Sequence, residues 1–278
     1  MTKNALSQSS IQSIERALKI LELLQGTDEI GITEIATRLT LPKGTIHGIV
    51  KTLEKCGYLE QNQSTRKYRC SSTLMRIGLA LLSRSNLHQI SQDSVKQLSE
   101  KFNQMAYVSV LVRDLCVVIA QHSPNNFFMN LSRIGSSISA YSTAMGKVLL
   151  SDFSPEQLDD IFLNASLTKF TRYTITNKDE LKKRILEASK KGYDVTHQES
   201  MLGLSCVAAP IRDYTGRIIA SISITASTDY LSLPEQLSEV VNEVVNAGQN
   251  ISCKLGYNFK HYQEQHNETV RNVGVVKK

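Results

Sequence analysis

Residues 31–60 read GITEIATRLTLPKGTIHGIVKTLEKCGYLE, and this stretch decides the fold of the N-terminal part of the chain. It predicts a short helix with Thr33 as its N-cap, a tight turn closed by Leu41-Pro42, and a further helix over residues 42–55 that ends at Gly57. The longer helix carries apolar residues at the spacing of one inward face: Ile46, Ile49, Val50 and Leu53.

The flanking residues complete a small domain. A helix over residues 11–24 precedes this stretch, with apolar side chains at helical spacing on one expected inner face: Ile14, Ala17, Leu18, Leu21 and Leu24. Two short strands, residues 58–60 and 67–70, follow around a polar turn. The order of three helices and a hairpin predicts a winged helix-turn-helix over residues 11–72.

Positive charge is concentrated in this domain. The 278-residue chain has a net charge of +6, and residues 38–69 hold seven basic side chains against two acidic ones. Such a patch favours contact with the phosphates of duplex DNA. The candidate contacts lie on the third helix and on the hairpin: Lys43, Gly44, Thr45, His47, Gly48 and Lys51, then Arg66, Lys67 and Arg69. A three-helix subdomain with no DNA ligand has the same periodicity, and this alternative stays open.

Two glycines stand inside the expected recognition helix. Gly44 and Gly48 each cost about 1 kcal/mol of helix propensity relative to Ala, and each removes a side chain that would face the groove. These positions either let the helix backbone approach the duplex closely or weaken the binding. The sequence leaves both outcomes open.

The remainder of the chain predicts a linker helix and a second domain. Residues 73–86 form a helix that is apolar on two sides, which favours pairing with a second copy of the chain. Residues 87–256 predict helices at 87–102, 143–153, 155–163, 178–191 and 234–255, and strands at 107–112, 116–121, 127–133, 193–199, 204–211 and 218–225. Antiparallel strands with segregated helices indicate an α+β sensor-like domain, followed by a polar tail at 257–278.

Several other classes of protein are disfavoured. Apolar runs fall far short of the roughly 20 residues of a transmembrane helix, and residues 1–10 lack the apolar core of a secretory signal. The five cysteines form no CxxC pair, which fits a reducing cytoplasm better than a disulfide framework or a zinc site. His197 and Cys206 lack a third group to orient them as a catalytic pair, and no P-loop or GxGxxG motif occurs. We expect a cytoplasmic protein that is not an enzyme and uses no metal, cofactor or membrane.

Five segments together resemble the IclR family of bacterial transcriptional regulators over about residues 11–256. They are residues 13–21 (SIERALKIL), 41–47 (LPKGTIH), 53–59 (LEKCGYL), 141–147 (YSTAMGK) and 203–211 (GLSCVAAPI). Within the family, residues 132–135 and 141–150 are most similar to the ketodeoxygluconate-repressor branch. The family usually has Ser at the position of Gly44, Arg at that of Gly48, and an aromatic residue or His at that of Arg212.

The resemblance implies a GAF-like C-terminal domain that binds a small carboxylate or sugar acid as effector. It implies that the ligand carboxylate meets the backbone N–H groups of Ala144 and Met145 at the start of a helix, where anions are favoured. Thr196 stands where many members have an acidic residue, which favours a more negatively charged ligand. The other implied pocket residues are Cys206, Ser223 and Thr225 on neighbouring strands, with Phe127 and Asn130 on the opposite wall.

The strand pattern alone assigns less to these residues than the resemblance implies. Alternation along residues 220–225 places Ser221, Ser223 and Thr225 on one face of a strand. Taken without the resemblance, these hydroxyls fit a solvent-facing strand equally well, and Cys206 fits a small core residue.

The charge pattern and the resemblance together predict a homodimeric, ligand-responsive DNA-binding regulator, with a tetramer left open. We expect a repressor of catabolic genes rather than an activator. One alternative is a metabolite-binding or enzymatic domain whose N-terminal helices only mediate oligomerisation. Another is a regulator whose glycine-containing recognition helix retains only non-specific binding to DNA.

Overall fold

The computed structural model describes residues 11–24, 27–84, 86–124, 133–162 and 166–258. The chain divides into two compact units, Met1–Arg84 and Ser85–Lys278, and each has its own hydrophobic core. Within the described ranges, no helix is both long enough and apolar enough to cross a membrane.

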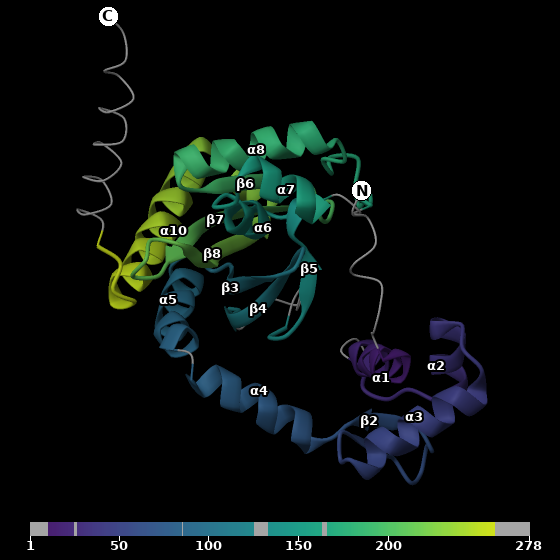
Figure 1. Ribbon diagram of the computed structural model, residues 1–278. Helices are drawn as coiled ribbons and strands as arrows, with labels where there is room; N and C mark the ends of the chain where they lie inside the picture. Colours follow the sequence, from purple (N-terminus) through teal and green to yellow (C-terminus); the bar gives the residue numbers. More distant parts are fainter. Residues whose placement is uncertain (1–10, 25–26, 85, 125–132, 163–165, 259–278) are drawn as a thin grey trace, which may run out of the picture. The chain divides into compact units, whose positions relative to one another are not determined.

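The N-terminal unit is a winged helix-turn-helix, as predicted (Figure 1). Its elements are α1 (Gln12–Leu23), α2 (Ile32–Leu39), α3 (Lys43–Lys55), β1 (Leu59–Gln61), β2 (Tyr68–Cys70) and α4 (Ser72–Arg84). Strands β1 and β2 pair antiparallel, and an isolated bridge joins Ile30 to Tyr68. The first three helices close around fully buried side chains, among them Ile20, Ile35 and Ile46. This core holds α3 with its opposite face toward solvent.

Two local predictions for this unit are wrong. Thr33 is not an N-cap, because α2 begins at Ile32 and Gly31 takes the cap position without a side-chain hydrogen bond. Ile14 and Leu18, expected on the inner face of α1, are 53% and 54% exposed, whereas Ile20 is fully buried. Helix α1 carries apolar side chains on more than one face, and the face around Ile20 is the one that meets the core.

The C-terminal unit is built on one curled antiparallel sheet, which confirms the predicted α+β class. Its strands follow the order β5-β4-β3-β8-β7-β6. They are β3 (Met105–Val112), β4 (Leu115–His122), β5 (Ser137–Ser139), β6 (Asp194–His197), β7 (Leu204–Arg212) and β8 (Ile218–Ser227). In the register, Thr196 lies opposite Cys206, and Cys206 lies opposite Thr225. Three residues of the predicted pocket are therefore neighbours across three strands.

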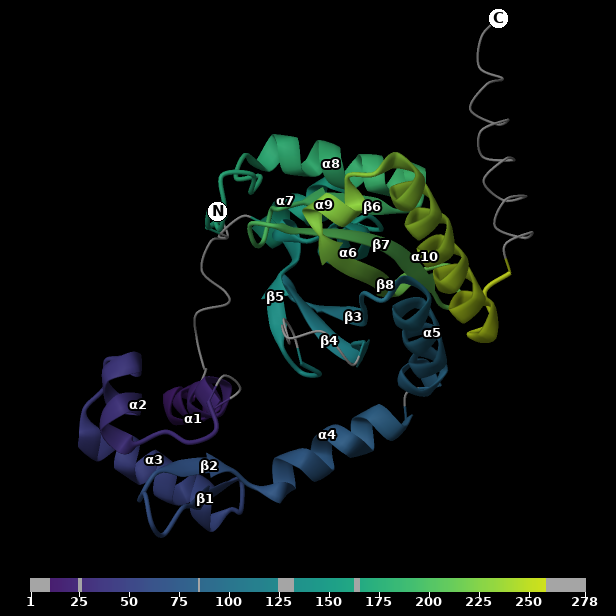
Figure 2. The same cartoon turned by 180° about the vertical axis from the view of Figure 1, so that it is seen from behind.

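Helices cover both faces of this sheet (Figures 1 and 2). One face carries α5 (Asn86–Phe102) and α10 (Pro234–Lys254), with the short α9 (Thr228–Leu231) after β8. The other face carries α6 (Ala144–Leu150), α7 (Pro155–Phe162) and α8 (Lys178–Lys191). A Cβ atom on Gly248 would lie 2.6 Å from the carbonyl oxygen of Pro210, so this glycine lets α10 lie directly against β7.

The edge next to β4 differs from the prediction. Residues 127–132 of the predicted strand lie outside the described residues, and Arg133 is not in a strand but precedes a turn at 134–135. The strand that pairs with β4 on the side away from β3 is β5, which the short sequence Ser-Ile-Ser did not reveal. A 3-10 turn over Ala140–Ser142 then leads into α6, which ends at Leu150 rather than at the predicted residue 153.

Candidate DNA interface and effector cavity

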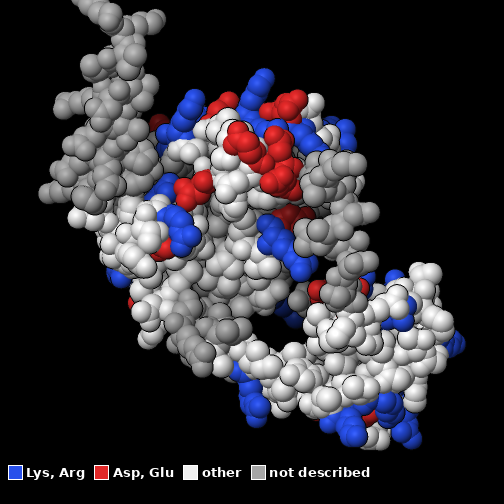
Figure 3. Space-filling view, viewed as in Figure 1, with Lys and Arg blue, Asp and Glu red and all other residues white. Residues whose placement is uncertain are grey.

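The solvent face of α3 carries most of the predicted DNA contacts. Lys43, Gly44, His47, Gly48 and Lys51 are exposed, Thr45 is half-buried, and Ile46 and Val50 on the opposite face are fully buried. The exposed positions follow the helical repeat, so they form one stripe along the helix. Figure 3 shows lysine and arginine side chains gathered along the edge of this unit where Figure 1 draws α3 and β2. The stripe offers hydrogen-bond donors to a nucleic-acid groove.

The hairpin β1–β2, called the wing below, presents the remaining candidates. Arg66, Lys67 and Arg69 are exposed, and Arg66 adopts a positive φ of 58° in the turn. The Arg69 Nε atom lies 2.6 Å from Glu60 Oε1. Exposed ion pairs of this kind contribute little to stability, so a phosphate oxygen can replace the carboxylate.

Lys51 connects the helix stripe with the wing. Its Nζ atom lies 2.8 Å from Glu54 Oε2 and 5.9 Å from the centre of the Tyr68 ring. The hydrogen bond to Glu54 raises the pKa of Lys51, so the ammonium group stays charged. The ammonium group of Lys51 on α3 thus lies next to the wing, so the helix stripe and the wing are adjacent at this residue.

The glycines of α3 are not required by packing within the described residues. A Cβ atom built on Gly44 or on Gly48 meets no atom of the described chain within 4 Å. The Gly48 carbonyl accepts a hydrogen bond of 2.9 Å from Thr52 Oγ1. The missing side chains therefore expose the helix backbone and do not accommodate a neighbouring element.

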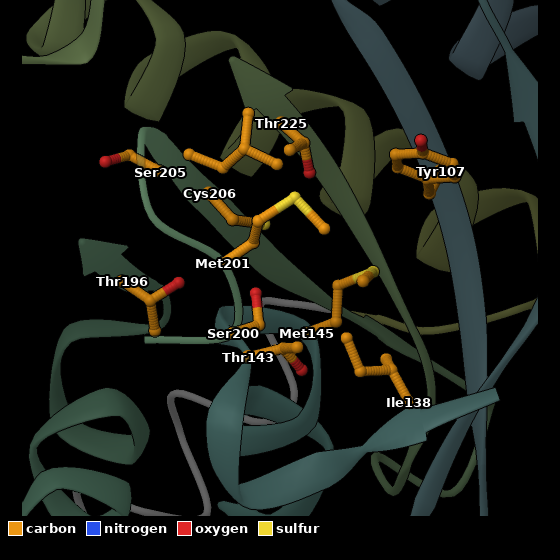
Figure 4. A pocket seen from close by; sticks show the side chains of 11 residues that line it. Tyr107, Ile138, Thr143, Met145, Thr196, Ser200, Met201, Ser205, Cys206 and Thr225 are labelled. Carbon is orange, nitrogen blue, oxygen red and sulfur yellow. The ribbon is translucent and has the colours of Figure 1, made fainter. Parts of the chain in front are cut away.

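A cavity of about 90 Å³ opens beside the sheet of the C-terminal unit (Figure 4). Side chains from five strands (β3, β5, β6, β7 and β8) and from the start of α6 surround it, and Met201 and Ser200 come from the loop after β6. No charged side chain belongs to the lining found in the described part of the chain. The full lining is Tyr107, Ile138, Thr143, Met145, Thr196, Ser200, Met201, Leu204, Ser205, Cys206 and Thr225.

The predicted effector residues fall into three groups. Met145, Thr196, Cys206 and Thr225 line the cavity. Ala144 and Ser223 are fully buried but do not belong to its lining. Phe127 and Asn130 lie outside the described residues. Sequence reasoning missed the remaining lining residues, including Tyr107 and Thr143, although Thr143 belongs to the YSTAMGK segment already singled out.

The cavity thiol is not set up for nucleophilic chemistry. Burial raises the pKa of Cys206 to about 11 and that of nearby Cys116 to about 12, so both are protonated at neutral pH. His197 Nδ1 makes a hydrogen bond of 3.2 Å with Ser205 Oγ, and His197 pairs with Ser205 rather than with Cys206 in the strand register. These contacts give no support to a Cys–His pair.

A mostly buried network of charges joins α6 and α8 to the segments that carry Thr196 and Ser200. Lys147 Nζ on α6 lies 2.5 Å from Glu199 Oε1, and Arg184 Nη2 on α8 lies 2.9 Å from Asp194 Oδ1. Lys147 is fully buried, and burial lowers its pKa while raising the pKa values of Asp194 and Glu199. Asp194 is two residues from Thr196 along β6, and Glu199 precedes Ser200. The network therefore ties α6 and α8 to two segments of the cavity wall.

Hydrogen bonds also hold the loop that carries Ser200 and Met201. The hydroxyls of Thr171 and Thr174 donate to the carbonyl oxygens of Gln198 and Glu199, at 2.6 and 2.7 Å. The cavity is thus largely pre-formed, as small-molecule sites usually are. Among the described residues, no three His, Cys, Asp or Glu side chains converge on a metal site.

Comparison with known proteins also distinguishes an N-terminal helix-turn-helix domain from a C-terminal domain. The family model of the IclR helix-turn-helix domain matches residues 13–63, and that of the bacterial transcriptional regulator IclR C-terminal domain matches residues 79–253. The chain is 30% identical over 248 residues to the HTH-type transcriptional regulators XynR and KdgR of Escherichia coli. These matches cover 89% of this chain, 98% of XynR and 94% of KdgR.

A solved structure supports the fold. The crystal structure of an IclR homolog from Microbacterium hydrocarbonoxydans, complexed with 4-hydroxybenzoate, matches with a TM-score of 0.72 and 21% sequence identity. The match covers 87% of this chain and 98% of that one. With the two family models and the relatives at 30% identity, these findings show that the chain belongs to the IclR family of DNA-binding transcriptional regulators, with an N-terminal helix-turn-helix and a C-terminal effector-binding domain.

Proposed function

We propose that this protein represses catabolic genes by binding an operator through α3 and the wing, and that a small carboxylate or sugar acid in the cavity controls this binding. The observation that carries the proposal is the exposed stripe on α3, which continues into the basic side chains of the wing. In winged domains such a helix enters the major groove while the wing lies along the phosphates. The proposed role needs no catalytic step and places the protein in the cytoplasm, where DNA and metabolites meet.

The chemistry of the cavity supports a small effector that has both polar and apolar parts. Hydroxyls of Thr143, Thr196 and Thr225 lie in the same lining as Met145 and Ile138. Because no cation belongs to the described lining, we propose that backbone N–H groups at the start of α6 bind the carboxylate. The names of relatives such as KdgR are consistent with an effector of sugar-acid type.

A charge placed in the cavity tests the effector class. Thr225→Asp should abolish the rise in melting temperature that a bound carboxylate produces, because the new carboxylate on the cavity wall repels it at short range. Ser189→Asp, an equal change on the exposed surface of α8, should leave the rise unchanged. The probes are gluconate, 2-keto-3-deoxygluconate and 4-hydroxybenzoate, and a melting temperature that none of them raises would contradict a carboxylate effector.

An exposed apolar surface on the N-terminal unit supports a homodimer. Ile14 and Leu18 on α1 lie beside Ile49, Leu53 and Tyr58 along one groove. Helix α4 of the same unit also exposes apolar side chains, Met75 at 66% and Ile77 at 44%. We propose that a second copy covers this surface, which would set the spacing of two recognition helices on DNA half-sites. Sedimentation should show a dimer for the parent and a monomer for Leu18→Glu, and a parent monomer would contradict the proposal.

The experiment that tests the whole function compares two duplexes. Fluorescence anisotropy should show tighter binding to the upstream region of the protein's own gene than to a scrambled duplex of equal length and composition. Equal affinities would mean that Gly44 and Gly48 have left only non-specific binding. No binding even at low salt would favour a metabolite-binding protein whose N-terminal helices serve only in oligomerisation.

A further inference from the structure

The tip of the wing has a closely defined backbone. Asn62 N donates to the Lys67 carbonyl oxygen at 2.9 Å, and Arg66 N donates to the Asn62 carbonyl oxygen at 2.8 Å. Arg66 stands at φ 58°, a left-handed conformation that is uncommon for a residue with a side chain. The Asn62 side chain also accepts hydrogen bonds from the backbone of Ser64 and Thr65. A conformation of this kind persists only where its surroundings hold it.

One carboxylate outside the wing holds this tip. Glu29 lies in the segment between α1 and α2, and both of its oxygens are used: Asn62 Nδ2 donates to Oε1 at 2.6 Å and Thr65 Oγ1 to Oε2 at 2.8 Å. Next to it, Ile30 and Tyr68 exchange two backbone hydrogen bonds of 2.9 Å. The segment before α2 is therefore bound to the base of the wing through its backbone and to the tip through Glu29.

The sign of this charge is unfavourable for DNA binding. Arg66, Lys67 and Arg69 are all exposed on the wing, and Lys67 and Arg69 lie near enough to act on Glu29, so this carboxylate opposes the attraction of phosphates. The hydrogen bonds from Asn62 and Thr65 lower the pKa of Glu29, so the group is charged at neutral pH. The charge of Glu29 by itself therefore reduces the affinity for DNA. Its hydrogen bonds can offset this loss only by contributing to DNA binding in another way.

We propose that Glu29 is a positioning residue for DNA binding: it fixes the tip of the wing through Asn62 and Thr65, so that Arg66 and Lys67 face the phosphate backbone. The inference rests on the proposed contact between the wing and DNA. A released tip no longer orients these cations, and each phosphate left without its cation costs affinity that exceeds the gain from removing one surface charge.

The direction of the change in affinity distinguishes this role from simple electrostatics. Glu29→Ala should weaken binding to duplex DNA about eightfold at roughly 0.1 M salt for each phosphate that the wing no longer neutralises, because log K falls by about 0.9 per neutralised phosphate for each tenfold rise in salt. The slope of log K against log salt should become shallower by the same 0.9 or so. Asp28→Ala removes an equal charge from the neighbouring exposed position, and should bind as well as the parent or more tightly.

A second variant separates positioning from misfolding. Thr65→Val removes one of the two hydrogen bonds to Glu29 at an exposed site and should also weaken binding and flatten the salt dependence. Thr65 Oγ1 also accepts a long hydrogen bond of 3.3 Å from Lys67 N, but the two residues share the bond to Glu29, so the double variant with Glu29→Ala should lose less affinity than the sum of the two single losses in log K. A fall in affinity with an unchanged salt slope would mean that less protein is folded, and it would overturn the proposal.

The other outcomes are equally distinct. If Glu29→Ala binds DNA as tightly as Asp28→Ala, the residue has no positioning role. Lys67→Ala tests the underlying interaction, because a wing that touches DNA must bind more weakly when this cation is removed. Should Lys67→Ala bind with the parent's affinity and salt slope, the proposed contact of the wing fails, whatever Glu29→Ala does.

Discussion

Replacement of Lys147 by Met should lower the unfolding free energy of the C-terminal unit far more than replacement of an exposed lysine does. Lys147, Arg184, Asp194 and Glu199 form a neutral set of four charges, of which Lys147 is fully buried. At 2.5 Å and an effective dielectric constant of about 20, the Lys147–Glu199 attraction is about 7 kcal/mol. Lys147→Met loses this attraction, but it also removes the cost of desolvating the ammonium group, which offsets part of the loss. We therefore expect a net decrease of about 3–5 kcal/mol in unfolding free energy.

The loss should depend on pH and on the partner. Burial already raises the pKa of Glu199, and without Lys147 this pKa rises further. A carboxyl group whose pKa is higher in the folded than in the unfolded chain destabilises the protein as pH rises from the unfolded pKa through the folded one. The loss of unfolding free energy in Lys147→Met should therefore shrink toward acid pH. Lys147→Met/Glu199→Gln restores neutrality and should recover most of the loss.

Urea unfolding followed by far-ultraviolet circular dichroism measures these differences at neutral and acid pH. Lys182→Met serves as the control, because Lys182 pairs with Asp159 at the surface, where the carboxylate is 58% exposed. It should change the unfolding free energy little. A single Lys147→Met variant within about 1 kcal/mol of the parent, or a double variant no more stable than the single one, would refute the reasoning.

Three further predictions follow from the packing and the pKa shifts. Gly48→Ala should raise the unfolding free energy by about 1 kcal/mol, whereas Gly146→Ala should lower it by about 3 kcal/mol or more, because its Cβ would lie 2.0 Å from a backbone oxygen; thermal unfolding of both variants checks this contrast. The three exposed thiols should react with a disulfide reagent at about pH 8 much faster than Cys116 and Cys206, whose pKa values are near 12 and 11, and five equal rates would contradict the burial. The pKa of Glu29 is lowered from 4.5, so its stabilising contribution is present above pH 4.5 and is lost as pH falls; the stability difference between the parent and Glu29→Gln should vanish in acid.

Local periodicity predicted the N-terminal unit well, because short connections leave three helices and a hairpin few ways to pack. It did not determine which of two apolar faces of α1 would be buried, and so Ile14 and Leu18 were misplaced. The role of Glu29 could not be predicted from the sequence. A single acid in a loop forms no recognisable pattern, and its hydrogen-bond partners lie more than 30 residues away along the chain.

The cavity was harder to predict than the interface. The resemblance found Met145, Thr196, Cys206 and Thr225, whereas alternation along β8 alone did not distinguish a pocket from a solvent-facing strand. Tyr107 comes from β3, and the curvature of the sheet and the position of α6 bring it to the others. Such an arrangement depends on tertiary packing, which a pattern within one segment does not contain.

The most direct test of the central claim, that α3 and the wing hold DNA through phosphates, is the salt dependence of affinity for two cation variants. Lys51→Ala and Arg69→Ala should each weaken binding to every duplex and reduce the slope of log K against log salt by about 0.9, measured by anisotropy between roughly 50 and 300 mM salt. Lys101→Ala, which removes a paired lysine from the effector-binding unit, should leave both quantities unchanged. Parent-like affinity and slope in both Lys51→Ala and Arg69→Ala would contradict the account.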